Sequence, residues 1–182
     1  MTTLLVPGLD GSPAPHWQAW WAARDPQAVL LRQDDFGAPD PAAWELRLAT
    51  ALYAHPGALV VAHSLGAILT VRVAARWPQL SISAALLVAP ADVERPHDRR
   101  IAGFGPIPRR RLAFPAVVAA SRTDPWMTLH RARRFAGAWG AALVDLGDVG
   151  HVNVESGHGP WPQGQALAAD LIAPRLRRVA AP

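Results

Sequence analysis

The sequence of 182 residues predicts a doubly wound α/β fold, in which a mostly parallel sheet of about six strands is flanked by helices. Three observations predict it. Short apolar runs alternate with helical patterns along the chain. These runs are apolar at nearly every position, which is typical of parallel strands covered on both faces. Hydrophobic residues make up 51% and charged residues 18%, which is enough apolar material for a packed core.

Each predicted element has a local reason in the sequence. The apolar runs that predict strands end at small or turn-forming residues, and they span 3–6, 29–31, 58–61, 84–88, 116–120 and 142–146. Helical patterns lie between them, at 17–22, 41–54, 65–76, 128–139 and 164–178. At the second helix, Asp40 can cap the N-terminus and Pro41 suits the first turn.

One stretch, residues 91–114, has no clear pattern and contains three prolines, Pro96, Pro106 and Pro108. It is too short for a separate domain, so we expect a loop or short helix that lies over the sheet. The whole chain, residues 1–182, is therefore predicted to form a single domain.

The charge of the chain is less informative than its pI of about 11.1 suggests. All 18 basic residues are arginine, and the net charge is only +4. Because only Tyr53 titrates between histidine and arginine, the high pI reflects the missing lysines rather than a strong positive field. Arginines cluster at 109–111, 131–134 and 175–178, where we expect solvated surfaces. Nucleic acid is therefore not an expected partner.

Several classes of site are excluded by what the sequence lacks. It has no cysteine, which excludes disulfides, thiolate catalysis and cysteine metal sites. No apolar run approaches the roughly 18 to 20 residues that a membrane span needs, and the first residues do not resemble a secretory signal. His151, His158 and the nearby acids do not have a familiar metal-ligand spacing. We therefore expect a cytoplasmic protein with no metal, no cofactor and no membrane partner.

The segment after the predicted strand 58–61 predicts a nucleophile. It reads Ala62-His63-Ser64-Leu65-Gly66 and leads directly into a helical pattern. This is the strand–turn–helix setting in which a strained turn exposes a serine hydroxyl above a sheet. Small residues are needed two positions before and after the serine, which Gly66 satisfies and Ala62 approaches. The alternative is that Ser64 only caps the helix.

A serine nucleophile needs a base, and the base needs an orienting acid. Asp124 follows the predicted strand 116–120, and His151 follows the strand 142–146. Each alone could be an ordinary loop or cap residue. Because the carboxyl ends of parallel strands meet at one edge of the sheet, the order Ser64, Asp124, His151 predicts a catalytic triad of the α/β-hydrolase kind.

Other residues compete for these roles. Asp92 also follows a predicted strand and is the alternative acid, whereas Asp148 lies so close to His151 that we expect it to be structural. His63 adjoins Ser64, but side chains of adjacent residues on such a turn point apart, so it is a poor base.

The glycine-rich turn after the first strand, Val6-Pro7-Gly8-Leu9-Asp10-Gly11-Ser12, predicts an oxyanion hole. Acyl transfer needs N–H donors for the oxyanion, and we expect the backbone N–H groups of Leu9 and Leu65 to supply them. The turn does not fit the dinucleotide pattern G-x-G-x-x-G, and a Walker-type phosphate loop needs a lysine that the chain lacks.

Several motifs together carry a family resemblance. They are the turn from Pro7-Gly8 to Gly11-Ser12, then His16-Trp17-Gln18, His63-Ser64-Leu65-Gly66, Ser121 to Asp124-Pro125-Trp126, Gly150-His151-Val152-Asn153, Ser156-Gly157 and Trp161-Pro162. With these motifs the chain resembles the small serine hydrolases of the YdeN and retinoblastoma-binding-protein-nine family. The resemblance covers nearly the whole chain, and residues 150–164 are its most specific part.

The resemblance implies a compact, cap-poor α/β-hydrolase with Ser64, Asp124 and His151 as its triad. Ala62, where glycine is usual, and Val152, where isoleucine is more usual, depart from the family pattern. We expect a serine hydrolase that acts on small ester or amide substrates through an acyl-enzyme, either carboxylesterase-like or aminopeptidase-like. Since only residues 91–114 could form a cap, the pocket should be shallow and prefer acyl groups of roughly two to six carbons.

Two questions stay open at this point. His16, Trp126 and Trp161 are candidates for pocket walls, but aromatic residues that bury so much area could equally pack in the core. The alternative function is a non-catalytic module that binds a protein partner or regulates it on the same scaffold. Such a module is expected to have a missing triad member or a degraded oxyanion turn, and the sequence has neither.

Overall fold

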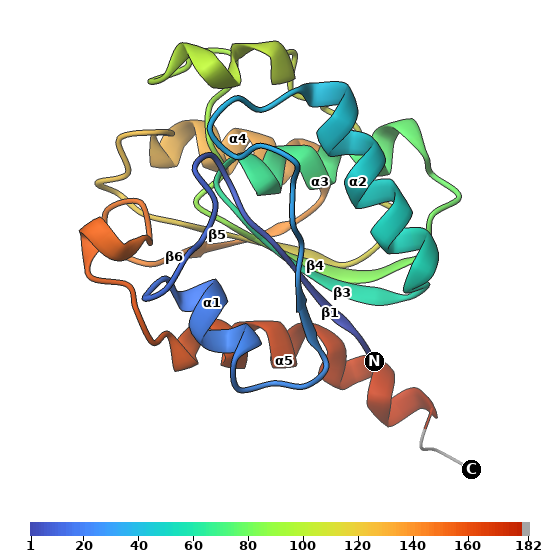
Figure 1. Cartoon of the computed structure of the whole chain (residues 1–182). Coiled ribbons are helices and arrows are strands. Elements are labelled where there is room, and N and C mark those ends of the chain that lie inside the picture. Colours follow the sequence, from blue (N-terminus) through green and yellow to red (C-terminus); the bar gives the residue numbers. More distant parts are fainter. Residues whose placement is uncertain (180–182) are drawn as a thin grey trace.

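Six strands form one all-parallel sheet in the computed structural model, which describes residues 1–179 and the side chains of residues 1–173 (Figure 1). The strands are β1 (Thr3–Val6), β2 (Ala28–Leu30), β3 (Ala58–His63), β4 (Ile82–Val88), β5 (Ala116–Ala120) and β6 (Ala142–Asp145). Their order across the sheet is β2-β1-β3-β4-β5-β6, and every neighbouring pair is parallel. The predicted fold class is confirmed.

Helices cover both faces of the sheet. Helices α1 (Trp17–Ala22) and α5 (Pro162–Val179) lie on one face, and α2 (Pro41–Ala54), α3 (Leu65–Arg76) and α4 (Leu129–Trp139) lie on the other (Figure 1). Neighbouring residues of a strand belong to different cores: Leu4 packs with the α2–α4 layer, and Leu5 packs with the α1–α5 layer. Burial on both faces explains why the strands are apolar without alternation.

The predicted elements are all present, with small differences at their ends. Strand β3 continues to His63 because it pairs along its whole length with β4, which begins at Ile82. Strand β2 runs one residue earlier than predicted and ends at Leu30. Helix α4 begins at Leu129 because Thr128 caps it, and α5 begins at Pro162, a residue that suits the first turn.

The irregular segment 91–114 contains one short 3-10 helix, η1 (Arg99–Phe104). Phe104 packs edge-to-face on Trp44 of α2, with 5.7 Å between the ring centroids, and its carbonyl oxygen accepts a hydrogen bond of 2.6 Å from Arg72 of α3. The helix therefore lies on the α2–α3 layer, and its residues Ile101 and Phe104 belong to the core that this layer forms with the sheet.

The arginine clusters are only partly the solvated surface that the sequence suggested. Arg109, Arg110 and Arg111 are exposed, but Arg131 is nearly buried and pairs with Asp92 and Glu94. The side chains of the cluster at 175–178 lie outside the described residues. No helix in the described part of the chain has the length and apolar character needed to cross a membrane.

Candidate active site

Ser64 occupies a strained turn at the carboxyl end of the central strand β3. It lies between His63, the last residue of the strand, and Leu65, the first residue of α3. Its φ of 56° and ψ of −121° are rare for a residue with a side chain. The Ser64 side chain makes no capping hydrogen bond to the helix. The structure therefore gives no support to a simple helix cap at this position.

The turn is possible because two glycines let three backbone segments approach closely. A Cβ atom on Gly66 would lie 2.5 Å from the carbonyl oxygen of Pro7, and one on Gly8 would lie 2.8 Å from the Cβ atom of Ser64. Real side-chain atoms do not tolerate such contacts, so glycine is required at both positions. The close approach brings the glycine-rich turn after β1 against the serine.

Three side chains from separate strand ends form an unbroken hydrogen-bonded chain. The Nε2 atom of His151 lies 2.8 Å from the Oγ atom of Ser64, and its Nδ1 atom lies 2.8 Å from the Oδ1 atom of Asp124. A carboxylate can only accept, so Nδ1–H donates to Asp124 and Nε2 accepts from the serine hydroxyl. All three side chains are buried. This is the arrangement that activates a serine as a nucleophile.

The competing acid, Asp92, is also buried, but it has other partners. Its carboxylate pairs with Arg131 and accepts hydrogen bonds of 3.2 Å from the backbone N–H groups of Glu94 and Arg95. These contacts occupy the carboxylate within its own loop and with α4. Asp124, by contrast, accepts from His151 and from the backbone N–H of Trp126 at 2.9 Å.

The two expected oxyanion donors lie on either side of the serine. Leu9 lines the cavity in front of Ser64, and Leu65 follows the serine directly. In the described part of the chain, neither backbone N–H has a hydrogen-bond acceptor. The turn that carries Leu9 is held by hydrogen bonds from Asp10 N–H to the Phe36 carbonyl and from Gly11 N–H to the Gly8 carbonyl. Both donors are thus available to a developing oxyanion.

Two further histidines border the site, and burial keeps both of them neutral at pH 7. Burial and the neighbouring His151 lower the pKa of His63 well below its usual value. The same two causes, with a smaller effect of His158, lower the pKa of His16 to about 4. His63 Nε2 lies 2.8 Å from the carbonyl oxygen of His151 and must donate to it. His63 therefore fixes the position of the His151 backbone. This structural role agrees with the prediction that His63 is a poor base.

Gln18 is the residue whose contribution sequence reasoning missed. Its buried amide donates to the carbonyl oxygens of Val6, at 3.2 Å, and Val61, at 3.1 Å. Its Oε1 atom accepts from the Ser12 hydroxyl at 2.7 Å. Gln18 therefore connects β1 and β3, which lead into the predicted oxyanion turn and into Ser64. The feature of the sequence that could have indicated this role is an amide side chain among the tryptophans of a short helix.

A cavity of about 410 Å³ opens in front of the serine. It is lined by Leu9, Asp10, Gly11, Pro13, Ala14, Pro15, His16, His63, Ser64, Trp126, His151, Asn153, Val154 and Glu155. The predicted wall residues His16 and Trp126 are among them. Trp161 is not, and this expectation is corrected: its ring packs edge-to-face on Trp17, 5.2 Å away, in the core between the sheet and α5.

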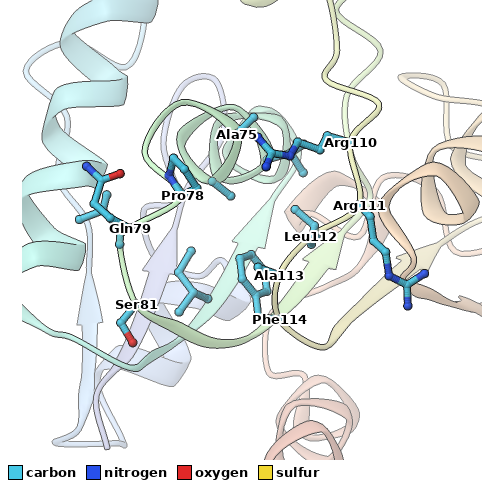
Figure 2. Close-up of a pocket in the computed structure, with 13 residues that line it drawn as sticks. Ala75, Pro78, Gln79, Ser81, Arg110, Arg111, Leu112, Ala113 and Phe114 are labelled. Atoms are coloured by element: carbon cyan, nitrogen blue, oxygen red, sulfur yellow. The ribbon is translucent and has the colours of Figure 1, made fainter.

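A second cavity, of about 330 Å³, lies at the opposite end of the sheet, beside the residues that precede β4 and β5. Figure 2 shows it between the end of α3, around Pro78, and the segment from Arg110 to Phe114 that precedes β5. It contains a serine, Ser81, but no histidine or carboxylate lines it. Among the described residues, no group of three histidine, aspartate or glutamate side chains is placed to hold a metal ion.

Comparisons with known proteins show the family of the chain. The family described as serine hydrolase matches residues 3–170. Comparison with curated proteins found no match. Among solved structures, a protein described as a YdeN-like hydrolase from Pectobacterium atrosepticum is 35% identical, with a TM-score of 0.83. That match covers 93% of this chain and 89% of the other.

More distant structures share the fold. The ydeN gene product of B. subtilis is 18% identical with a TM-score of 0.78, and the match covers 94% of this chain and 98% of that one. An esterase from Rhodococcus, RhEst1, is 14% identical with a TM-score of 0.67, over 94% of this chain and 91% of that one. At these identities the likeness concerns the fold alone.

Proposed function

Because the chain belongs to the serine hydrolase family, we propose that it cleaves small ester or amide substrates through an acyl-enzyme formed on Ser64. The observation that carries the proposal is the hydrogen-bonded chain from Asp124 through His151 to Ser64 on a strained turn. A helix cap or a binding module has no use for all three contacts together. The strain at Ser64 is likewise explained by a need to expose its hydroxyl.

In the proposed mechanism the Oγ atom of Ser64 attacks the substrate carbonyl carbon while Nε2 of His151 takes the hydroxyl proton. The carbonyl oxygen becomes an oxyanion and accepts from the N–H groups of Leu9 and Leu65. His151 then gives its proton to the leaving alcohol or amine as the bond to it breaks. A water molecule, activated by the same imidazole, hydrolyses the acyl-enzyme and restores Ser64. Asp124 keeps Nδ1 protonated throughout.

The volume of the cavity limits the length of the acyl group. Its volume of about 410 Å³ is near the lower end for small-molecule sites, and no residue of η1 is among those that line it. Short acyl chains of roughly two to six carbons therefore fit the proposal best. A clear optimum on long-chain lipid esters, with interfacial activation, would contradict it.

The charges around the cavity favour acyl groups without negative charge. Two carboxylates, Asp10 and Glu155, are among its lining residues. Asp10 is paired with Arg100 of η1 at 2.8 Å, so Glu155 is the lining carboxylate without an ion pair in the described part of the chain. Two of the histidines that line it, His16 and His63, are held neutral by burial. A succinyl ester would bring a like charge towards Glu155, so we expect it to react more slowly than a butyryl ester of the same alcohol.

Labelling with a fluorophosphonate tests the proposal directly, because the reagent reacts with activated serines and leaves ordinary serines unmodified. We expect one adduct per chain, mapped by peptide mass spectrometry to Ser64. Ser64→Ala should abolish labelling and His151→Ala should reduce it drastically, since an unassisted hydroxyl is a poor nucleophile. Ser81→Ala, in the second cavity, is the matched control and should label fully. If the wild-type protein takes no label and cleaves no ester or amide, a binding module becomes the better interpretation.

A further inference from the structure

Trp126 packs against the imidazole of His151 more nearly face to face than any other ring in its surroundings. The two ring centroids are 5.3 Å apart, and the planes differ by 26°. The ring of His63 is equally near, at 5.0 Å, but it is tilted by 52°. Trp126 is thus the aromatic side chain whose face is turned to His151.

The position of this indole is coupled to the triad through the backbone. The N–H of Trp126 donates to the Oδ1 atom of Asp124 at 2.9 Å, the same oxygen that accepts from His151. The Trp126 carbonyl accepts from the N–H of Asp92 at 3.0 Å. These contacts use only backbone atoms of Trp126, so a leucine or phenylalanine at this position can still make them and the substitution tests the ring.

The face of an indole attracts cations. Its π system is negative above and below the ring plane, and a cation within about 6 Å of the ring centroid is stabilised, more strongly where water is excluded. His151 is buried, and in acyl transfer its imidazole becomes an imidazolium in each transition state. A stacked indole therefore favours the charged form over the neutral one.

We propose that Trp126 is a positioning residue that stabilises the protonated form of His151 through the face of its indole. Its kinetic consequence rests on the function proposed above, but its effect on the titration of His151 does not. Trp126 then does more than enclose substrate, because it lowers the barrier to moving the proton from Ser64 to His151.

Other ionisable groups also act on His151. Asp124 and His63 contact it directly, and His97 lies across the indole. His16 packs against His63, and His158 acts electrostatically on both His16 and His63. Asp124 is unchanged by a substitution at Trp126, and burial keeps His63 and His16 neutral. His97 packs edge-on against Trp126 at 5.2 Å and is exposed, so it needs its own control.

The experiment compares two variants. Trp126→Leu keeps an apolar side chain over His151 but removes the π face, whereas Trp126→Phe keeps a smaller π face. The imidazole signals of His151 are followed by NMR against pH, and the pH profile of kcat/KM is measured on a short ester. We expect Trp126→Leu to lower the titration midpoint of His151 by about half to one pH unit, a three- to tenfold change in the protonation equilibrium. Trp126→Phe should recover at least half of that shift, and His97→Ala should leave the midpoint within about 0.2 units.

The kinetic and spectroscopic results separate the two proposals. With Trp126→Leu, kcat should fall about three- to tenfold with KM changed less than kcat. An unchanged midpoint in a folded Leu variant, or an effect on KM alone, would overturn the role of Trp126 and leave it a cavity wall. If the midpoint shifts as expected while Ser64 takes no fluorophosphonate, the role of Trp126 stands and the proposed hydrolysis fails.

Discussion

Asp92 and Asp124 lie at equivalent places in the fold, and their surroundings differ in one decisive respect. Each follows a strand of the sheet at its carboxyl end, Asp92 after β4 and Asp124 after β5, and each is buried. The partner of Asp92 is the guanidinium of Arg131 from α4, whereas that of Asp124 is the imidazole of His151. The same residue type at neighbouring strand ends thus forms two different kinds of site.

The chemical nature of the partner determines what a buried carboxylate can do. A guanidinium is always charged, so the pair between Asp92 and Arg131 can only hold α4 against the loop after β4. An imidazole exchanges its proton near neutral pH, so the pair between Asp124 and His151 can take part in proton transfer. The first pair should serve stability and the second chemistry, and each of the following predictions tests part of that division.

The largest effect is expected from Asp124→Asn. The amide removes the charge that stabilises the imidazolium and can hold the imidazole in the wrong tautomer, so turnover of a short ester should fall by about 10⁴. The thermal unfolding midpoint should change little, because asparagine keeps the shape of the side chain. A variant that retains more than a tenth of wild-type kcat would remove Asp124 from the proposed triad.

Asp92→Asn should give the opposite pattern. Loss of the carboxylate leaves the guanidinium of Arg131 buried with only Glu94 as an acidic partner, so the free energy of unfolding should fall by about 2–4 kcal/mol in urea titrations. Turnover at a temperature where the variant is folded should stay within about threefold of wild type.

The double variant Asp92→Asn with Arg131→Gln is the matched control for that change. Removing both charges should restore part of the lost stability, because no unpaired guanidinium is left. If Asp92→Asn instead lowered turnover as strongly as is expected for Asp124→Asn, Asp92 would be the acid of the triad.

A smaller effect, on the pH dependence of the free energy of unfolding, is expected from the buried histidines His16 and His63. The pKa of His16 is lowered from 6.5 to about 4 on folding, so between these values the unfolded chain binds a proton that the folded chain does not. The free energy of unfolding should therefore fall as the pH is lowered through that window, by about 2 kcal/mol between pH 7 and pH 5 from this group. Stability is full above pH 6.5, and His63, whose pKa is also lowered, acts in the same direction.

His16→Asn separates this contribution from the rest. Asparagine can still accept the hydrogen bond from the Gln18 N–H that His16 accepts at the start of α1, but it does not titrate. The variant should lose less stability than wild type when the pH falls from 7 to 5. Equal losses in both proteins, measured by urea unfolding at the two pH values, would contradict the assignment.

The elements of the fold were predictable because their signals are local. The continuous apolar runs of β1 and β5 and the periodic pattern of α3 were recognised with their observed ends. The elbow around Ser64 was predictable for the same reason, since a strand, a serine and a glycine lie within a few residues. Chain order alone then suggested Asp124 and His151, because parallel strands bring their carboxyl ends together.

Other features could not be read from local pattern. Trp126 and Trp161 are the same residue type and were equal candidates for the pocket wall, yet one stacks on His151 and the other packs on Trp17 in the core. Their surroundings come from segments far apart in the chain, so no nearby residue distinguishes them. The same holds for Gln18, whose partners Val6 and Val61 lie on two different strands.

By itself the sequence determined the α/β class, the strained turn at Ser64 and the three strand ends from which a serine, an acid and a histidine reach one edge of the sheet. Chain order favoured Asp124 over Asp92 as the acid, but the contact between Asp124 and His151 is visible only in the folded chain. Arg131 lies in α4, where its helical pattern shows only a surface cluster, and packing of that helix brings its guanidinium to Asp92. Asp124 is then the carboxylate that pairs with His151. The physical reason is that charge pairing depends on distances across the fold, which a pattern along the chain does not contain.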